Sequence, residues 1–108
     1  MVDTKLQSIC EDFGAEIEAI RSSGNNEFID ITGGELKGSL TVQYLNERIS
    51  IVYFYDAQYY DVSDDMLYSI VRSILAGQYT MEKKGVVKKR IVPIVTVQGH
   101  KVYPDAFR

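Results

Sequence analysis

The chain has 108 residues, of which 45% are hydrophobic and 25% charged, and its formal net charge is −3. These values are typical of an ordinary globular protein, and we treat residues 1–108 as a single domain. The one cysteine, Cys10, excludes an intramolecular disulfide, and the first residues, Met1 to Lys5, do not resemble a secretory signal peptide. The apolar runs are too short for a membrane span. We therefore expect a cytoplasmic protein that does not contact a membrane.

The charges are sorted along the chain. From Met1 to Glu82 there are 14 acidic and 5 basic residues, a net charge of −9. From Lys83 to Arg108 there are 7 basic residues and one acidic residue, a net charge of +6. This asymmetry predicts a basic C-terminal strand segment, residues 83–108, that binds an acidic partner or pairs with the acidic body.

Apolar residues at helical spacing predict a first helix from Leu6 to Ile20, with Asp3 or Thr4 as its cap and Gly24 at its end. Gly14 lies inside this predicted helix, where it costs about 1 kcal/mol relative to alanine. The residues that carry the pattern are Leu6, Ile9, Cys10, Phe13, Ile17 and Ile20.

A three-strand meander is predicted next. Gly33-Gly34 forms a two-residue hairpin turn that places Asp30 opposite Lys37. A second turn around Asn46-Glu47 places Val42 opposite Ile51 and Leu40 opposite Tyr53. This register gathers the apolar residues on one sheet face. They are Ile29, Ile31, Leu36, Leu40, Val42, Tyr44, Ile49, Ile51, Tyr53 and Tyr55.

The second half of the chain predicts a helix capped by Ser63, with an apolar stripe from Leu67 to Leu75 and Gly77 at the C′ position. A polar connection, residues 80–85, leads to a strand from Val86 to Val97, in which Pro93 favours an edge position or a bulge. A turn at residues 98–100 precedes a short strand or extended tail. The expected fold is a two-layer α+β sandwich in the order α-β-β-β-α-β(-β), an antiparallel meander with two helices on one face.

The chain shows little that indicates catalysis. His100 lies in a predicted turn without a partner at a recognisable spacing, and Cys10 lies on the apolar helix stripe, where free cysteine is usually inert. Four carboxylates between Asp56 and Asp65 lack the spacing of a calcium loop, so a solvated turn is the preferred interpretation over a cation site. No glycine-rich phosphate loop precedes a helix. We therefore expect no enzyme activity, no cofactor and no metal.

A partner-binding surface is predicted instead. Val52 and Phe54 fall on the polar sheet face, where Phe28 also points, and Tyr59 and Tyr60 lie in the connection beside that end. Exposed aromatic residues next to charges are typical interface anchors, although a further strand or the C-terminal tail would also cover them. The basic residues of the segment allow two readings, protection of a sheet edge or contact with phosphates. These residues are Lys83, Lys84, Lys88, Lys89 and Arg90.

The sequence thus predicts a small non-enzymatic protein–protein interaction module of the adaptor or inhibitor type, with a homodimer as one form of it. The predicted contact residues are Phe28, Val52, Phe54, Tyr59, Tyr60, Lys88, Lys89 and Arg90. The alternative is a nucleic-acid-binding protein that uses Lys83 to Arg90 together with exposed aromatic residues.

Overall fold

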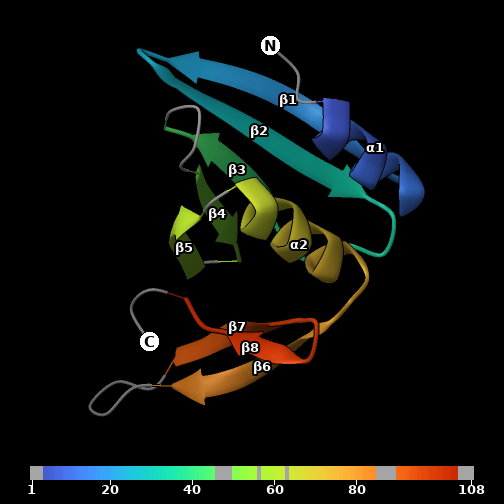
Figure 1. Cartoon of the computed structure of the whole chain (residues 1–108), viewed down its shortest axis with the longest axis vertical. Helices are drawn as coiled ribbons and strands as arrows, with labels where there is room; N and C mark the ends of the chain where they lie inside the picture. The colour runs from blue at the N-terminus through green and yellow to red at the C-terminus, as the bar shows by residue number, and fades with distance from the viewer. Residues whose placement is uncertain (1–3, 46–49, 56, 63, 85–89, 105–108) are drawn as a thin grey trace.

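The computed structural model describes residues 4–45, 50–55, 57–62, 64–84 and 90–104. Two helices and antiparallel sheets form in these residues, which confirms the predicted α+β fold (Figure 1). The elements in chain order are α1 (Thr4–Asp12), β1 (Ala15–Ser23), β2 (Asn26–Gly33), β3 (Leu40–Tyr44), β4 (Ser50–Phe54), β5 (Ala57–Val62), α2 (Asp64–Leu75), β6 (Tyr79–Lys84), β7 (Arg90–Val97) and β8 (His100–Val102).

The first helix is shorter than predicted. It ends at Asp12, and a turn closes with hydrogen bonds from the amides of Phe13 and Gly14 to the carbonyls of Cys10 and Glu11. Gly14 has a φ of 69°, which glycine adopts without strain, so the chain leaves the helix there. The prediction of a helix through Ile20 was wrong, because residues 15–20 also alternate with the period of a strand and form β1.

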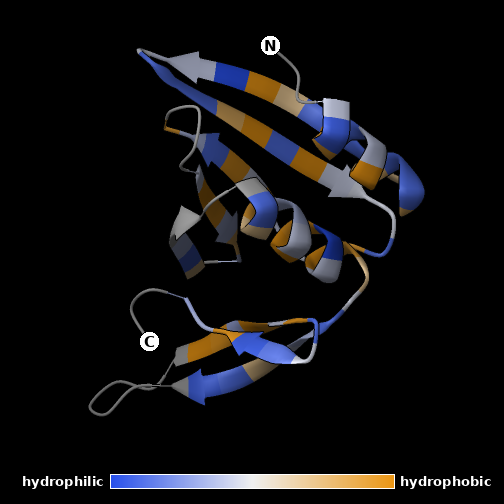
Figure 2. Cartoon of the chain, viewed as in Figure 1, coloured by the Kyte–Doolittle hydropathy of each residue, from blue (hydrophilic) through white to orange (hydrophobic). Residues whose placement is uncertain are grey.

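The first five strands form one antiparallel sheet in the order β1-β2-β3-β4-β5, in which each strand pairs with the next along the chain. One row of cross-strand partners joins Ile29, Val42, Val52 and Tyr59, and the next apolar row joins Ile31, Leu40, Phe54 and Ala57. Figure 2 shows the resulting alternation of hydrophobic and hydrophilic residues along β2. The meander is therefore present, with more strands than predicted.

Both predicted hairpin registers were wrong. β2 and β3 are joined by a longer loop, so Asp30 lies opposite Thr41 and not opposite Lys37. At the next hairpin Leu40 lies opposite Phe54 and not opposite Tyr53, a shift of one residue. Because side chains alternate between sheet faces, this shift moves every residue of β4 to the opposite face from the one predicted.

The second helix forms as predicted, although Ser63 lies outside the described residues. The amide of Gly77 donates to the carbonyl of Ile74, and the amide of Gln78 donates to the carbonyl of Ser73. With Gly77 at a φ of 76°, this pattern is a Schellman cap, which satisfies carbonyls at the end of the helix.

The three C-terminal strands form a second sheet in the order β6-β7-β8. Residues 80–84 are part of β6, so the predicted polar connection there was wrong. Pro93 lies where β7 pairs with β6 alone, because β8 begins to pair only at Val95. This position is a local edge, in agreement with the prediction for Pro93. The turn at Gln98-Gly99 and the short strand β8 also form where expected.

One hydrophobic cluster holds these parts together. It joins buried residues of both helices to the apolar rows of the five-stranded sheet and to Val95 and Val97 of β7. Because the sheet residues of this cluster share one face, α1 and α2 cover the same side, as Figure 1 shows. The hydroxyl of Tyr59 in β5 donates to the carbonyl of Pro93 at 2.8 Å and ties the two sheets together. In the described residues, neither helix is long and apolar enough to cross a membrane.

Candidate functional site

Three of the predicted contact residues lie in the core. Val52, Phe54 and Tyr59 are each 0% exposed, so the prediction that they form an accessible patch was wrong. For Val52 and Phe54 the cause is the one-residue register shift, which turns them toward the helices. Tyr59 belongs to β5 and not to a connection, and its burial raises the pKa of its hydroxyl.

The other predicted residues have different outcomes. Phe28 points to the sheet face opposite the helices, as expected, and is half-buried. Tyr60 and Arg90 belong to β5 and β7, but their side chains lie outside the described residues, as do Lys88 and Lys89 altogether. The role of these four residues stays a prediction.

The sheet face opposite the helices, which we call the open face, is the first candidate site. By register it carries alternate residues of β1 to β5, and it is exposed only in part, since Gln43 and Ile51 are 8% and 5% exposed. Its side chains include Glu16, Ala19, Arg21, Phe28, Asp30, Thr32, Thr41, Gln43, Ile51, Tyr53 and Gln58.

A charged hydrogen-bonded group lies on the open face. The guanidinium of Arg21 donates two hydrogen bonds to the carboxylate of Asp30, each 2.9 Å long, and the hydroxyl of Thr41 donates a third at 2.7 Å. The bond from Arg21 holds the pKa of Asp30 below its usual range. Asp30 is therefore an ionised acceptor whose geometry is fixed from β1 and β3.

Beside this group the open face becomes less polar. The guanidinium of Arg21 lies 5.2 Å from the centre of the Phe28 ring, a cation–π contact. Next to Phe28 in the register come Gln43, which accepts a hydrogen bond from the hydroxyl of Tyr53, and then Ile51. An aromatic ring set among oriented polar groups can bind another surface, but it provides no nucleophile with an adjacent base.

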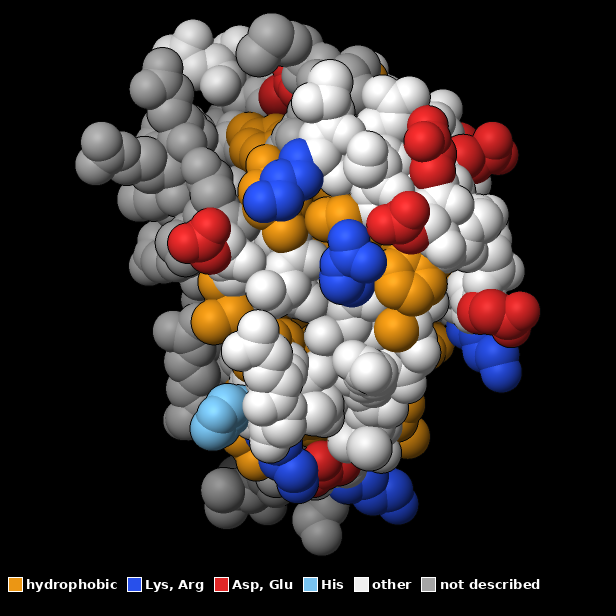
Figure 3. Space-filling view, turned by 45° about the vertical axis from the view of Figure 1, so that its right-hand side comes forward, with side chains coloured by type: hydrophobic (Ala, Val, Ile, Leu, Met, Phe, Trp, Pro, Cys, Tyr) orange, Lys and Arg blue, Asp and Glu red, His pale blue; other side chains and the backbone are white. Residues whose placement is uncertain are grey.

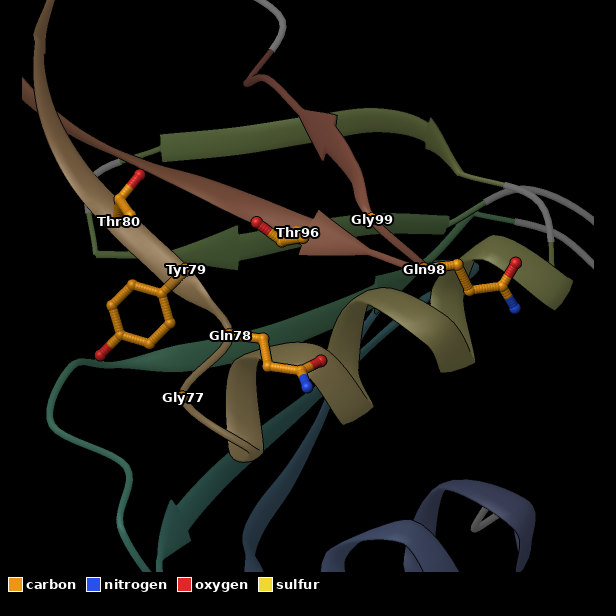
Figure 4. A pocket seen from close by; sticks show the side chains of 7 residues that line it. All are labelled: Gly77, Gln78, Tyr79, Thr80, Thr96, Gln98 and Gly99. Carbon is orange, nitrogen blue, oxygen red and sulfur yellow. The ribbon is translucent and has the colours of Figure 1, made fainter.

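A groove of about 430 Å³ lies between the end of α2 and the three-stranded sheet (Figure 4). The Schellman cap and the Gln98-Gly99 turn shape it, since Gln98 and Gly99 have φ values of 50° and 81° and form the tight hairpin between β7 and β8. Its lining is Gly77, Gln78, Tyr79, Thr80, Thr96, Gln98 and Gly99.

The chemistry of this groove is neutral. Figure 4 shows the side chains of Gln78, which precedes β6, and Gln98, which follows β7, apart from each other. Burial and a hydrogen bond with Tyr55 raise the pKa of Tyr79, so its hydroxyl stays protonated at neutral pH. The groove can offer hydrogen bonds to an uncharged polar group, but no charge and no general base.

A second groove lies between α1 and α2, on the side that Figure 3 shows, where basic and hydrophobic side chains lie next to each other. The ammonium of Lys5 lies 4.7 Å from the Tyr68 ring centre, and the guanidinium of Arg72 lies 5.7 Å from that of Phe13. Arg72 also contacts Asp12 at 3.5 Å. The cations here pack on rings and pair with a carboxylate, as surface residues of helices commonly do.

The other titratable candidates form no cluster. Cys10 is buried and unpaired, and burial raises the pKa of its thiol, which lowers its reactivity. His100 is exposed at the start of β8. Within the described residues, no group of three or more His, Cys, Asp or Glu side chains lies close enough to hold a metal ion. Asp56 and the side chains of Asp61 and Asp64 lie outside the described residues.

No protein-family model, no curated protein and no solved structure matches the chain.

Proposed function

We propose that this chain is a non-enzymatic protein-binding module that docks through the open face of its five-stranded sheet. The observation that carries the proposal is the position of Phe28. It is a half-buried aromatic ring on the sheet face opposite the helices, next to the fixed ion pair of Arg21 and Asp30. An aromatic anchor beside an arginine, within a polar surround, is the composition that protein interfaces favour.

Two further features support this proposal. The polar side chains of the open face are oriented by bonds within the sheet, so a partner meets donors and acceptors that are already ordered. A cytoplasmic site of action is part of the proposal, because the only cysteine has no partner for a disulfide within the chain.

The experiment is quantitative affinity capture from the native host with the parent chain, Phe28→Ser and Met66→Ser. Met66 is 42% exposed on α2, so Met66→Ser removes a comparable apolar side chain from the helix side and serves as the matched control. We expect Phe28→Ser to lose a specific protein that Met66→Ser retains, with both variants folded by circular dichroism. Equal recovery of every captured protein by the two variants would refute docking through the open face.

Nucleic-acid binding is the second candidate, and the register of β6 and β7 favours it. Lys83 and Lys84 lie opposite Ile91 and Arg90, so three basic residues, Lys83, Lys84 and Arg90, fall on a two-stranded ribbon. A ribbon of this kind can follow a phosphate backbone. Binding of a labelled oligonucleotide that weakens steeply with added salt and with Lys83→Glu would favour this function over the first.

A further inference from the structure

The acidic and basic residues that are separated along the sequence also lie at different ends of the folded molecule. Four exposed carboxylates lie on α1 and β1, which we call the acidic end: Glu11, Asp12, Glu16 and Glu18. The exposed Lys83 and Lys101 lie on the three-stranded sheet at the other end of the longest axis, which extends 41 Å (Figure 1). At the lower end of the molecule Figure 3 shows basic side chains with an acidic side chain between them.

These two ends are too far apart to neutralise each other within one molecule. Between exposed charges the interaction is largely screened beyond about 10 Å at ordinary ionic strength. The cations near the acidic end are already paired, since Arg72 contacts Asp12 and Arg21 contacts Asp30. On the three-stranded sheet Lys101 lies 3.8 Å from Glu82, so Lys83 is the residue that carries the proposed contact there. Attraction between the acidic end and the basic sheet is therefore available only between molecules.

The outer half of the β6–β7 hairpin adds an apolar contact to this charge. In the described residues of this part, 81–84 and 90–93, which we call the basic arm, Met81 is 42% exposed and Ile91 is 62% exposed. Met81 lies opposite Pro93, and Lys83 lies opposite Ile91, so all four residues share one face of the hairpin. Large exposed apolar side chains beside a cation are typical of an interface centre with a charged rim.

We propose that two copies of this chain form an antiparallel dimer in which the basic arm of each copy packs against the acidic end of the other. Because the complementary surfaces lie at opposite ends of an elongated molecule, the antiparallel arrangement makes two equal contacts and closes the assembly with two-fold symmetry.

The area required is modest. A specific interface of standard size buries about 800 Å² on each partner. This is roughly one-eighth of the 6726 Å² accessible surface of the chain. Two contacts, each involving a hairpin arm and one face of a helix and strand, can supply such an area.

The test is sedimentation velocity over a hundredfold range of protein concentration, with the parent chain, Lys83→Glu, Glu18→Lys and an equimolar mixture of the two variants. We expect a dimer for the parent chain, with a dissociation constant that rises as the ionic strength goes from about 0.05 M to about 0.5 M. Each single variant should weaken the dimer by about tenfold, because every dimer then contains two like-charge contacts.

The equimolar mixture of the two variants tests whether Lys83 of one copy contacts the acidic end of the other. In a dimer of one Lys83→Glu chain and one Glu18→Lys chain, both contacts again join opposite charges, so we expect the parent affinity to return. Lys37→Glu is the matched control, since Lys37 is exposed, lies outside the basic arm, and its substitution changes the net charge by the same amount. This control should dimerise like the parent chain, and thermal melts should show that all variants are folded.

Several results would overturn the proposal. A parent chain that stays monomeric at every concentration contradicts the dimer. Particles larger than a dimer contradict the closed antiparallel arrangement. A dimer that is indifferent to salt and to Lys83→Glu contradicts the role of the basic arm, as does a monomer that binds an oligonucleotide through Lys83.

Discussion

The two faces of the five-stranded sheet differ in their side chains, although the same strands form both. On the covered face, Ile29, Val42 and Val52 are each 0% exposed and pack under the helices. On the open face, the hydroxyl of Thr41 donates a hydrogen bond to the carboxylate of Asp30, and both side chains are partly exposed to solvent. Stability therefore resides mainly on one side of the sheet, and recognition is free to use the other.

The expected energies differ accordingly. Full burial of a large apolar side chain stabilises a protein by about 1.5–3 kcal/mol, whereas an ion pair on a surface contributes about 0–1 kcal/mol. Substitutions on the open face should consequently alter binding without unfolding the chain, while those on the covered face should unfold it. This difference can be measured directly in β4, where both kinds of residue are adjacent.

The largest effect is expected for Phe54→Ala. Phe54 is 0% exposed in the core, next to the rings of Tyr55 and Tyr79 at centroid distances of 4.7 Å and 4.9 Å. Its truncation should lower the free energy of unfolding by about 3–5 kcal/mol, measured by urea denaturation. Tyr53→Ala, one residue away on the open face, should cost about 1 kcal/mol or less. Similar costs for both variants would contradict the register of β4.

Gly34→Ala should produce the next largest effect. Gly34 has a φ of 60°, and a methyl group there would lie 2.6 Å from the backbone carbonyl oxygen of Phe13, at the end of α1. The backbone penalty and the clash together should cost about 2–4 kcal/mol.

Gly24→Ala is the matched control, because Gly24 has a φ of 61° but nothing within 4 Å of the added methyl group. It should therefore show only the backbone penalty of about 1–2 kcal/mol. Equal melting temperatures for the two variants would mean that the loop after β2 does not pack closely against the turn between α1 and β1.

Strong local signals in the sequence predicted the fold class, α2 with its Gly77 cap, and the turn at Gln98-Gly99. Each of these depends on residues close together in the chain, such as an apolar helical stripe followed by glycine. The helix through Ile20 failed because Ile17 and Ile20 satisfy a helical pattern as well as the strand in which they lie. Local propensity cannot distinguish the two, and the positive φ of Gly14 decided between them.

The candidate site was harder to predict because it depends on register. Ser50 is 0% exposed on the covered face, and its hydroxyl has no hydrogen-bond partner among the described residues, whereas Tyr53 lies on the open face. Polarity alone therefore assigns the residues of β4 to the wrong sheet faces. Phe28 was placed correctly because β2 alternates clearly around it. The sequence did not predict the ion pair of Arg21 and Asp30, because Arg21 follows the predicted first helix. A hairpin that turns at Gly24-Asn25 would have placed both residues on neighbouring strands.

Tyr59→Phe tests how the covered face is joined to the second sheet. The hydroxyl of Tyr59 donates to the carbonyl of Pro93 in a buried bond of 2.8 Å, so its removal leaves a buried acceptor without this donor. We expect a loss of about 1–2 kcal/mol in the free energy of unfolding. Tyr53→Phe removes a hydroxyl bonded to Gln43 on the open face and should cost less, since that site is only part-buried. An equal loss for the two variants would mean that Tyr59 does not couple the sheets.

The smallest effect concerns the open face and depends on pH. Because Arg21 lowers the pKa of Asp30, the folded state favours the ionised carboxylate more than the unfolded state does, where the ordinary pKa is 3.8. The stabilisation is thus present above that pKa and is lost as the pH falls through the lower pKa of the folded state. Asp30→Asn should be less stable than the parent by at most about 1 kcal/mol at neutral pH, and the difference should close as the pH falls through the lowered pKa of Asp30 in the folded state. Asp12→Asn alters the looser 3.5 Å pair with Arg72 and should change the free energy of unfolding less. If the stability loss of Asp30→Asn instead grows as the pH falls, Asp30 is not held ionised on the open face.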